Sequence, residues 1–260
     1  MIEEISDWEI EKAKNVLNAH VVKPLTSEGA LESLLFCIAS QAWAWEPASK
    51  FIYDLRQKSY PEDFNAIKKY ASLDVLNDKK LVNKIAKENG WRFHHQDRFD
   101  APLDYFEKQN GLWYEDILNA DSVIRAEYCK NVKWVSNKTF SFWHICLGGT
   151  NLLALDVHVM KNLSCFGLSI NESYFISKPR LSGNQKVRKT PNNKDYIRIE
   201  EDAKNFFSYD ERFLLDNKKV NLALVDSLLW WRGANRGSLR QINLFKECEI
   251  INYLPYANIL

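Results

Sequence analysis

A chain of 260 residues can bury a substantial core, either as one large domain or as two smaller lobes. The formal net charge of +1 excludes a molecule that is basic all over, so any surface for nucleic acid has to be local. No apolar run approaches the roughly 18 residues that a membrane-spanning helix needs, and the charged N-terminus lacks the apolar core of a signal peptide. We therefore expect a cytoplasmic protein with no membrane association.

The cysteine pattern disfavours metal and disulfide frameworks. The five cysteines are widely spaced and no two form a Cys-x-x-Cys pair, which argues against a disulfide scaffold, a zinc ribbon or an iron–sulfur cluster. The adjacent residues His94 and His95 have no carboxylate or cysteine at a spacing suited to a metal site. We expect no metal and no cofactor.

The predicted elements are helices along most of the chain. Leu31, Leu34 and Ile38 fall on one face of the first of them, and residues 61–70 begin with proline and acidic residues, as the first turns of helices do. The expected helical segments are, in chain order, residues 29–40, 61–70, 72–88, 114–130, 138–147, 157–167 and 220–233, the last ending at Gly233.

Residues 178–198 differ from the rest of the chain. They are polar and weakly periodic, and they carry seven basic residues against the single acidic Asp195, a local charge of +6. One interpretation is a solvated loop. The other is a flexible basic segment that docks on phosphates.

Lys138 and Asp156 both fall at predicted helix starts. Ser136 and Asn137 form a plausible cap, so Lys138 lies in the first turn of a helix that Gly148 and Gly149 end. Asp156 precedes the next short helix and is expected to be its N-cap. The two helix starts could therefore face one space, with an amine on one side and a carboxylate on the other.

An amine and a carboxylate so placed have a definite chemistry. The positive end of the helix dipole and partial burial among Phe140, Phe142 and Trp143 both disfavour a protonated lysine. A neutral lysine can form an imine with a carbonyl or with C1′ of a sugar, and a carboxylate can stabilise positive charge that develops on the sugar. The alternative is a surface lysine and a capping aspartate with no relation to each other.

The spacing Lys138-x17-Asp156, followed by His158 and Val159, resembles the helix-hairpin-helix DNA glycosylase superfamily. The likeness is to its 8-oxoguanine glycosylase/lyase branches, including the archaeal-type enzymes. The resemblance implies an all-α, two-lobed fold with a central cleft for DNA and the base. It also implies that Lys138 attacks C1′ of the damaged nucleotide, while Asp156 assists glycosidic cleavage and caps its helix.

Further stretches carry the resemblance from about residue 30 to residue 232. Gln41 stands where these enzymes have a residue of the base pocket, residues 89–99 resemble their middle-lobe loop, and Asp226 and Trp230 match the D-x-x-x-W of their base-recognition helix. With Phe142, these residues form the expected base pocket. The expected DNA-binding residues are Arg92, His94, Lys133, Ser136, Lys186, Arg188 and Lys189.

One stretch departs from the resemblance. The hairpin before Lys138 reads VKWVSNK, with Trp134 and Ser136 where the superfamily has glycines that let backbone amides approach a phosphate. We expect weaker or different phosphate binding there, with the basic segment in compensation. His158 is expected to be a packed structural residue rather than a base.

The resemblance also implies a domain division. Residues 1–40 and 150–260 are expected to form one helical lobe, with the basic insertion at about 170–198. Residues 41–149 are expected to form the central lobe with the degenerate helix-hairpin-helix. The expected partner is double-stranded DNA that contains a modified base, bound by a monomer.

The expected function is base excision, with 8-oxoguanine as the substrate, and the imine would also permit strand cleavage by β-elimination. One alternative is a phage-defence glycosylase that excises a glucosylated hydroxymethylcytosine into a pocket of aromatic faces. A second is a non-catalytic helical DNA-binding module. A third, a Schiff-base lysine enzyme on a small carbonyl substrate, fits poorly because the sequence shows no alternation of strands and helices. The tryptophans that suggest the first alternative are Trp43, Trp45, Trp134, Trp143, Trp230 and Trp231.

Overall fold

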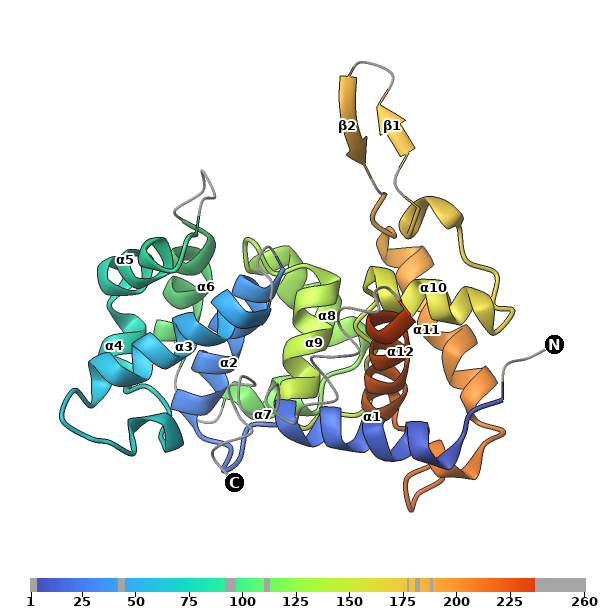
Figure 1. Cartoon of the computed structure of the whole chain (residues 1–260), viewed down its shortest axis with the longest axis horizontal. Helices are drawn as coiled ribbons and strands as arrows, with labels where there is room; N and C mark the ends of the chain where they lie inside the picture. The colour runs from blue at the N-terminus through green and yellow to red at the C-terminus, as the bar shows by residue number, and fades with distance from the viewer. Residues whose placement is uncertain are drawn as a thin grey trace. The chain divides into compact units, whose positions relative to one another are not determined.

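The computed structural model describes residues 4–41, 45–91, 97–109, 113–176, 178–180, 183–187 and 189–236. These residues are almost entirely helical (Figure 1). They divide into two compact units, and the division falls inside helix α1 (Asp7–His20). In the described residues, the central unit runs from Asn18 to Gly149, and the terminal unit joins the stretch up to Leu17 to the stretch from Thr150 to Arg236.

The central unit is built around α2, a helix that is buried on nearly all sides. Every residue from Gly29 to Ala39 is buried, and the helix contacts α3, α4, α6 and α9. Thr26 caps its start by accepting a hydrogen bond from the Gly29 amide. The elements of this unit are α2 (Ser27–Ser40), α3 (Trp45–Ser59), η1 (Ala66–Lys68), α4 (Leu73–Asn77), α5 (Lys79–Glu88), α6 (Asp97–Glu107), α7 (Trp113–Leu118), α8 (Ser122–Asn131) and α9 (Asn137–Cys146).

Polar groups inside this unit are satisfied in place. Glu32 and Arg56 are both buried and form an ion pair with a shortest distance of 2.6 Å. The second oxygen of Glu32 accepts a hydrogen bond from the Ala71 amide at 2.8 Å. The indole N–H of Trp143 donates to the carbonyl oxygen of Ala30 at 3.0 Å, which ties α9 to α2. Buried charges and donors of this kind are tolerated only when they are paired.

The terminal unit packs α10 and α12 against each other along an apolar seam. Asn162 of α10 donates from its amide to the carbonyl oxygen of Leu229 in α12 at 3.0 Å. A side chain at Gly233 would collide with the Cβ of His158, so a glycine is needed where the two helices approach closely. The elements of this unit, with the first part of α1, are α10 (Val157–Cys165), η2 (Glu172–Tyr174), β1 (Lys178–Arg180), β2 (Gly183–Val187), α11 (Asn193–Phe207), η3 (Glu211–Phe213) and α12 (Leu222–Arg236).

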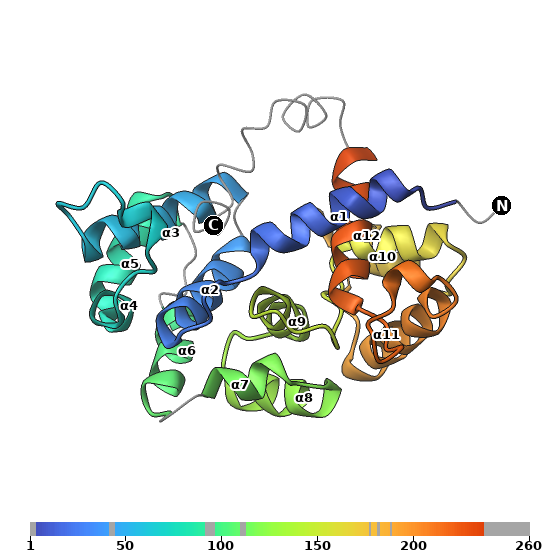
Figure 2. The same cartoon turned by 90° about the horizontal axis from the view of Figure 1, so that it is seen from below.

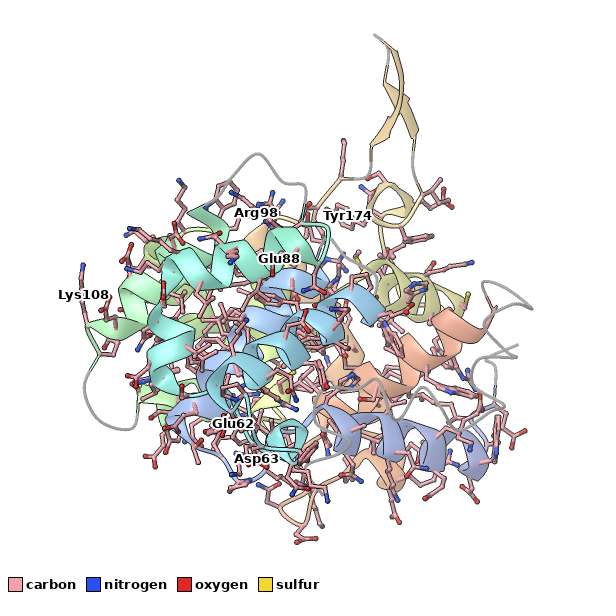
Figure 3. The ribbon with its side chains drawn as sticks, turned by 60° about the vertical axis from the view of Figure 1, so that its left-hand side comes forward. Glu62, Asp63, Glu88, Arg98, Lys108 and Tyr174 are labelled. Atoms are coloured by element: carbon pink, nitrogen blue, oxygen red, sulfur yellow. The ribbon has the colours of Figure 1, made fainter. Side chains whose placement is uncertain are left out.

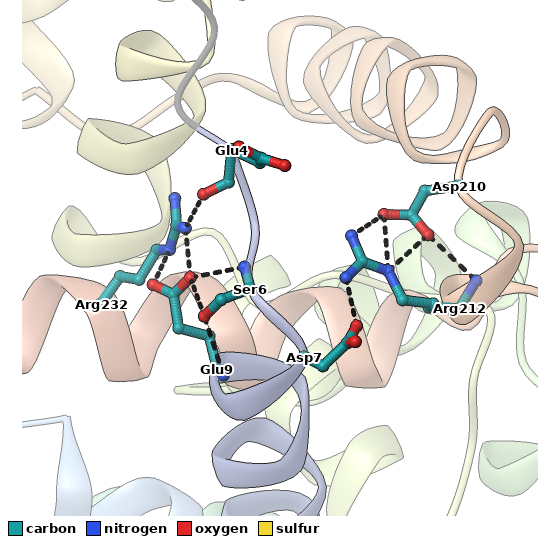
Figure 4. A network of polar contacts seen from close by, with 7 residues as sticks. All are labelled: Glu4, Ser6, Asp7, Glu9, Asp210, Arg212 and Arg232. Carbon is teal, nitrogen blue, oxygen red and sulfur yellow. Dashed lines mark hydrogen bonds and ion pairs between the residues drawn. The ribbon is translucent and has the colours of Figure 1, made fainter.

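The start of α1 is tied to the rest of the terminal unit by two arginines (Figure 4). The Arg232 guanidinium binds both carboxylate oxygens of Glu9, each at 2.7 Å, and Arg212 bridges Asp7 and Asp210. Burial acts to raise the pKa of the Glu9 carboxyl, but hydrogen bonds from Arg232 and Ser6 outweigh it and leave that pKa below its usual range. Figure 2 shows α1 lying beside α12.

Most of the expected helices are present, and four segments differ from expectation. Residues 61–70 form turns around η1, and Figure 3 labels Asp63 in this stretch. The Asp63 carboxylate accepts a hydrogen bond from the Asn65 amide, which makes an Asx-type turn, and it also forms an ion pair with Lys69. Residues 114–130 form two helices, since Asp121 caps the start of α8. The last helix continues through Gly233 to Arg236.

The fourth difference lies in the basic segment. Part of it forms a two-stranded antiparallel hairpin, with Lys178 opposite Val187 and Pro179 opposite Lys186, and α11 begins within it at Asn193. Figure 1 shows β1 and β2 extending away from α10 and α11 of the same unit. Tyr174 donates to Asp195 at 2.6 Å and so joins the segment before β1 to the start of α11 (Figure 3).

In the described residues the chain passes from one unit to the other after Leu17 and after Gly149. The N-terminal boundary lies after Leu17 rather than at residue 40, because α2 is enclosed by helices of the central unit.

Candidate active site

Lys138 lies in the first turn of α9, directly after the turn that joins α8 to α9. Ser136 is the N-cap, as expected, and its hydroxyl accepts a hydrogen bond from the Thr139 amide at 3.2 Å. The Thr139 hydroxyl accepts in return from the Ser136 amide, which completes a capping box. The cap fixes the start of α9 and with it the base of the half-buried Lys138 side chain.

Two other predicted site residues lie near Lys138 in the central unit. Gln41, at the end of α2, donates from its side-chain amide to the hydroxyl of Thr139, the residue next to Lys138. Phe142 is one helical turn after Lys138, so the two side chains share a face of α9. The Phe142 ring meets the ring of the buried His20 edge to face, with centroids 5.7 Å apart.

Cys37 and His20 belong to this environment and were not predicted from the sequence. Burial and a hydrogen bond with Cys146 raise the pKa of the Cys37 thiol well above its usual range, while the charge of Lys138 acts in the opposite direction. The Cys37 side chain is buried, with its sulfur 3.9 Å from that of Cys146. Its position one turn before Gln41 on α2 is a signal that could have found it.

The turn before α9 holds a tryptophan in a conformation that glycine favours. Trp134 has a φ of +72°, in the left-handed region, at a position where the resemblance predicts glycine. The Arg98 guanidinium lies 4.8 Å and the Lys133 ammonium 5.1 Å from the centroid of its ring. Two cations thus gather on one aromatic ring close to the start of α9.

Asp156 caps α10 in the terminal unit, as expected. Its Oδ1 accepts hydrogen bonds from the amides of His158 and Val159, both at 2.8 Å. Both bonds use the same oxygen, so Oδ2 takes no part in the cap. The side chain is half-buried.

Asp226 and Trp230 lie one turn apart on α12, as the D-x-x-x-W pattern predicts. Asp226 is 7% exposed, and its Oδ1 accepts a hydrogen bond from the Ala154 amide at 2.9 Å. This contact joins α12 to the segment that leads into Asp156. Trp230 is half-buried against the apolar core of the terminal unit, and His158 packs against Gly233.

The arrangement of helices matches two solved structures. The first is an 8-oxoguanine glycosylase/lyase of Methanocaldococcus jannaschii in complex with a 15mer DNA containing 8-oxoguanine, with a TM-score of 0.55 and 16% identity over 88% of this chain and 91% of that one. The second is an 8-oxoguanine DNA glycosylase of Thermotoga maritima, with a TM-score of 0.52 and 16% identity over 86% of this chain and 88% of that one.

The chain has the fold of the 8-oxoguanine DNA glycosylases. The expected all-α fold is thereby confirmed, with the β1–β2 hairpin as an addition to its helices. No protein-family model matches the sequence, and no curated protein matches it either. The likeness to the glycosylase fold is therefore one of structure, at an identity too low to fix the substrate.

Within this glycosylase fold the two predicted catalytic residues come from different units, Lys138 from the central unit and Asp156 from the terminal one. Lys133 and Ser136, predicted to bind DNA, are exposed at the turn before α9. Lys189 is exposed just after the hairpin, and Lys186 lies in β2. Arg92, His94 and Arg188 lie outside the described residues.

The described residues lack two kinds of feature. No three His, Cys, Asp or Glu side chains there are grouped so as to hold a metal ion. None of the helices there has the length and apolar character to cross a membrane.

Proposed function

We propose that this protein is a DNA glycosylase that extrudes a modified base from duplex DNA and releases it. The observation that carries the proposal is the placement of Lys138 in the first turn of α9 and of Asp156 at the N-cap of α10, in a fold shared with 8-oxoguanine glycosylases. A base inside a duplex is out of reach, so an enzyme of this kind has to take it out of the stack, at a cost of a few kcal/mol.

Lys138 is the proposed nucleophile. Its neutral amine attacks C1′, the bond between C1′ and the base breaks, and the base leaves with the bonding electrons and takes up a proton. Asp156 stabilises the positive charge that develops on the sugar, with its Oδ1 anchored by two amides of α10. Opening of the sugar ring then gives an imine between Lys138 and C1′, from which β-elimination can cleave the strand.

The proposed base contacts come from Gln41 and Phe142 in the central unit and from Trp230 in the terminal unit. Phe142 offers a half-buried aromatic face one turn from Lys138, and stacking on such a face contributes about 1–3 kcal/mol per base in single-strand binders. Gln41 uses one amide N–H on the Thr139 hydroxyl, so its carbonyl oxygen and second N–H are the groups proposed to recognise a base edge. Trp230 is the proposed aromatic contribution from the terminal unit.

8-Oxoguanine is the proposed substrate because both structural neighbours are 8-oxoguanine enzymes. The rival substrate, a glucosylated cytosine, rests on the many tryptophans. Trp143 is fully buried with its N–H bound to Ala30, and Trp231 meets Trp8 edge to face at 5.1 Å. Both rings are therefore engaged in packing, which removes part of the support for a large aromatic pocket.

The test is a panel of duplex oligonucleotides that carry 8-oxoguanine, glucosylated hydroxymethylcytosine or only ordinary bases, assayed for base release and for borohydride trapping at two salt concentrations. We expect release of 8-oxoguanine and a covalent adduct with the wild type. Lys138→Gln is expected to lose the adduct and to lower base release by at least about 100-fold. Lys130→Gln, the same change on an exposed lysine of α8, serves as the matched control.

Three results would contradict parts of the proposal. Release of only the glucosylated cytosine overturns the substrate, and base release without any adduct removes the lyase step. Tight DNA binding with neither release nor adduct on any duplex supports the non-catalytic module instead.

A further inference from the structure

The segment from Leu152 to Leu155 leads directly into Asp156 and belongs to no helix or strand. All four of its side chains are buried, so its backbone amides need partners inside the protein. Asp156 itself donates from its amide to the carbonyl oxygen of Ala154 at 2.7 Å. The path of this segment therefore determines where the Asp156 backbone lies.

Three successive amides of the segment bind three side chains. The Leu153 amide donates to Glu200, the Ala154 amide to Asp226 and the Leu155 amide to the hydroxyl of Tyr196, each at 2.9 Å. The same Tyr196 hydroxyl donates to the carbonyl oxygen of Leu153 at 2.8 Å. We call Tyr196, Glu200 and Asp226 the backbone clamp.

The clamp comes from two helices and is buried throughout. Tyr196 and Glu200 lie one turn apart on α11, and Asp226 lies on α12. Their exposed fractions are 1%, 4% and 7%. Burying two carboxylates costs desolvation free energy, which their hydrogen bonds to the backbone offset. Hydrogen bonds in a water-free interior are strong and restrict their partners to a narrow range of geometries. Apolar packing alone would not fix the three amides in this way.

We propose that Tyr196, Glu200 and Asp226 are positioning residues for Asp156 in base excision. The inference rests on the proposed function. The clamp holds the chain before Asp156, and the amides of α10 hold its Oδ1, so the carboxylate is fixed from both sides. This role replaces base recognition as the proposed task of Asp226, whose Oδ1 is occupied by the Ala154 amide.

Tyr196→Phe tests the clamp by removing one oxygen and keeping the ring. It deletes the contacts with Leu153 and Leu155, whereas Tyr209→Phe, the matched control, deletes the hydroxyl of a tyrosine that is 92% exposed just after the same helix. In single-turnover base release on saturating duplex, we expect Tyr196→Phe to be at least about 10-fold slower, since misplacement by an ångström can cost about 100-fold. Its Kd for the duplex should stay within about twofold of wild type, and Tyr209→Phe should match wild type in both measurements.

A conservative variant separates positioning from a general loss of stability. Glu200→Gln keeps an oxygen that can accept from the Leu153 amide, so we expect it to retain at least about a third of the wild-type rate. A Tyr196→Phe variant that releases base at the wild-type rate overturns the inference. So does one that slows base release only in proportion to weaker DNA binding.

Amide hydrogen exchange of residues 153–155, followed by NMR, distinguishes failure of this inference from failure of the proposed function. A wild type that is inert on every duplex contradicts the proposed function, whatever the exchange shows. Faster exchange at these amides in Tyr196→Phe, but not in Tyr209→Phe, supports the clamp. Unchanged exchange in both variants overturns it.

Discussion

At the scale of single residues, Trp134 stands at a backbone position that glycine fills most easily. Its φ of +72° costs an L-residue roughly 1–2 kcal/mol. The contacts of its ring with Arg98 and Lys133 offset part of that cost, at about 0.5–1 kcal/mol each. The turn before α9 therefore keeps the backbone of a glycine hairpin while adding a tryptophan and two cations beside the start of the Lys138 helix.

A pair of substitutions isolates the backbone cost. Trp134→Gly and Trp134→Ala both remove the ring, but only glycine relieves the left-handed conformation. We expect Trp134→Gly to have a free energy of unfolding about 1 kcal/mol above that of Trp134→Ala, measured by urea denaturation. The order should reverse at the exposed Val123 of α8, where alanine is the better residue by about 0.5–1 kcal/mol. Equal stabilities at position 134 would contradict the strain argument.

The residue scale also shows what the sequence can predict. Ser136 and Asp156 cap their helices as predicted, because a cap depends only on residues within three positions of it. Asp226 could not be predicted in the same way. Its partner Ala154 is 72 positions away along the chain, so local sequence holds no trace of the contact.

At the scale of elements, His144 joins α9 to α7. Its ring is fully buried, and Nδ1 donates to the carbonyl oxygen of Ile117 at 2.7 Å, since a carbonyl can only accept. A side chain at Gly149 would collide with this ring, so the Gly148-Gly149 turn that ends α9 is packed onto it. Burial lowers the pKa of His144 to about 4, and the nearby charge of Arg125 acts in the same direction. The hydrogen bond to Ile117 acts to raise the pKa but is outweighed.

This histidine makes the stability of the central unit depend on pH. The unfolded chain takes up a proton at a pKa near 6.5, whereas the folded chain does so only near 4. Between these values the unfolded state binds more protons, so the free energy of unfolding falls as the pH is lowered from about 6.5 to 4. Over this pH range the change in the free energy of unfolding that His144 causes approaches about 3 kcal/mol.

His144→Asn removes the titrating group and keeps a donor for Ile117. We expect the variant to be less stable at pH 7 but to lose about 2–3 kcal/mol less than wild type when the pH falls to 4. Urea denaturation at half-unit steps of pH measures both curves, and carboxylates elsewhere affect the two proteins alike. Parallel curves for wild type and variant would show that His144 is not the source.

Helices with strong local signals were predictable, and the exceptions have physical causes. The expected helix at 61–70 is replaced by turns because the Asp63 carboxylate competes for the Asn65 amide. Gly233 does not end α12 because it serves close packing against His158, a contact with another helix. A glycine that ends a helix and a glycine that allows close helix packing cannot be told apart in the sequence. Only the tertiary contacts distinguish the two roles.

At the scale of the whole molecule, the two units differ in how far the sequence could assign them. The boundary at Gly149 and Thr150 lies at the Gly-Gly pair after α9, where the sequence predicts the end of a helix. The assignment of α2 to the central unit could not be predicted, because a helix that is buried on nearly all sides carries no polar face to show which neighbours enclose it. Its contacts with α3 and α9 place it in the central unit, with Gln41 at its end.

Charge is also uneven over the whole molecule. The chain has a net charge of only +1, yet residues 178–198 carry +6. Part of this charge lies on the β1–β2 hairpin. The hydrogen bond from Tyr174 of η2 to Asp195 of α11 joins the two elements that flank the hairpin in the chain. If the hairpin docks on phosphates, it contributes affinity that depends on salt and not on the base being excised.

The triple variant Lys186→Gln, Arg188→Gln and Lys189→Gln tests whether the basic segment docks on phosphates. We expect weaker binding to every duplex, damaged or not, and a slope of log K against log salt that is less steep by up to about 2.7 when all three residues contact phosphates. The rate of base release at saturating DNA should stay within about twofold of wild type, because none of the three residues belongs to the proposed catalytic pair. The control neutralises three exposed lysines of the same unit outside the hairpin, Lys12, Lys14 and Lys219. An equal change of slope in the control would mean that net charge alone, and not the hairpin, sets the affinity for DNA.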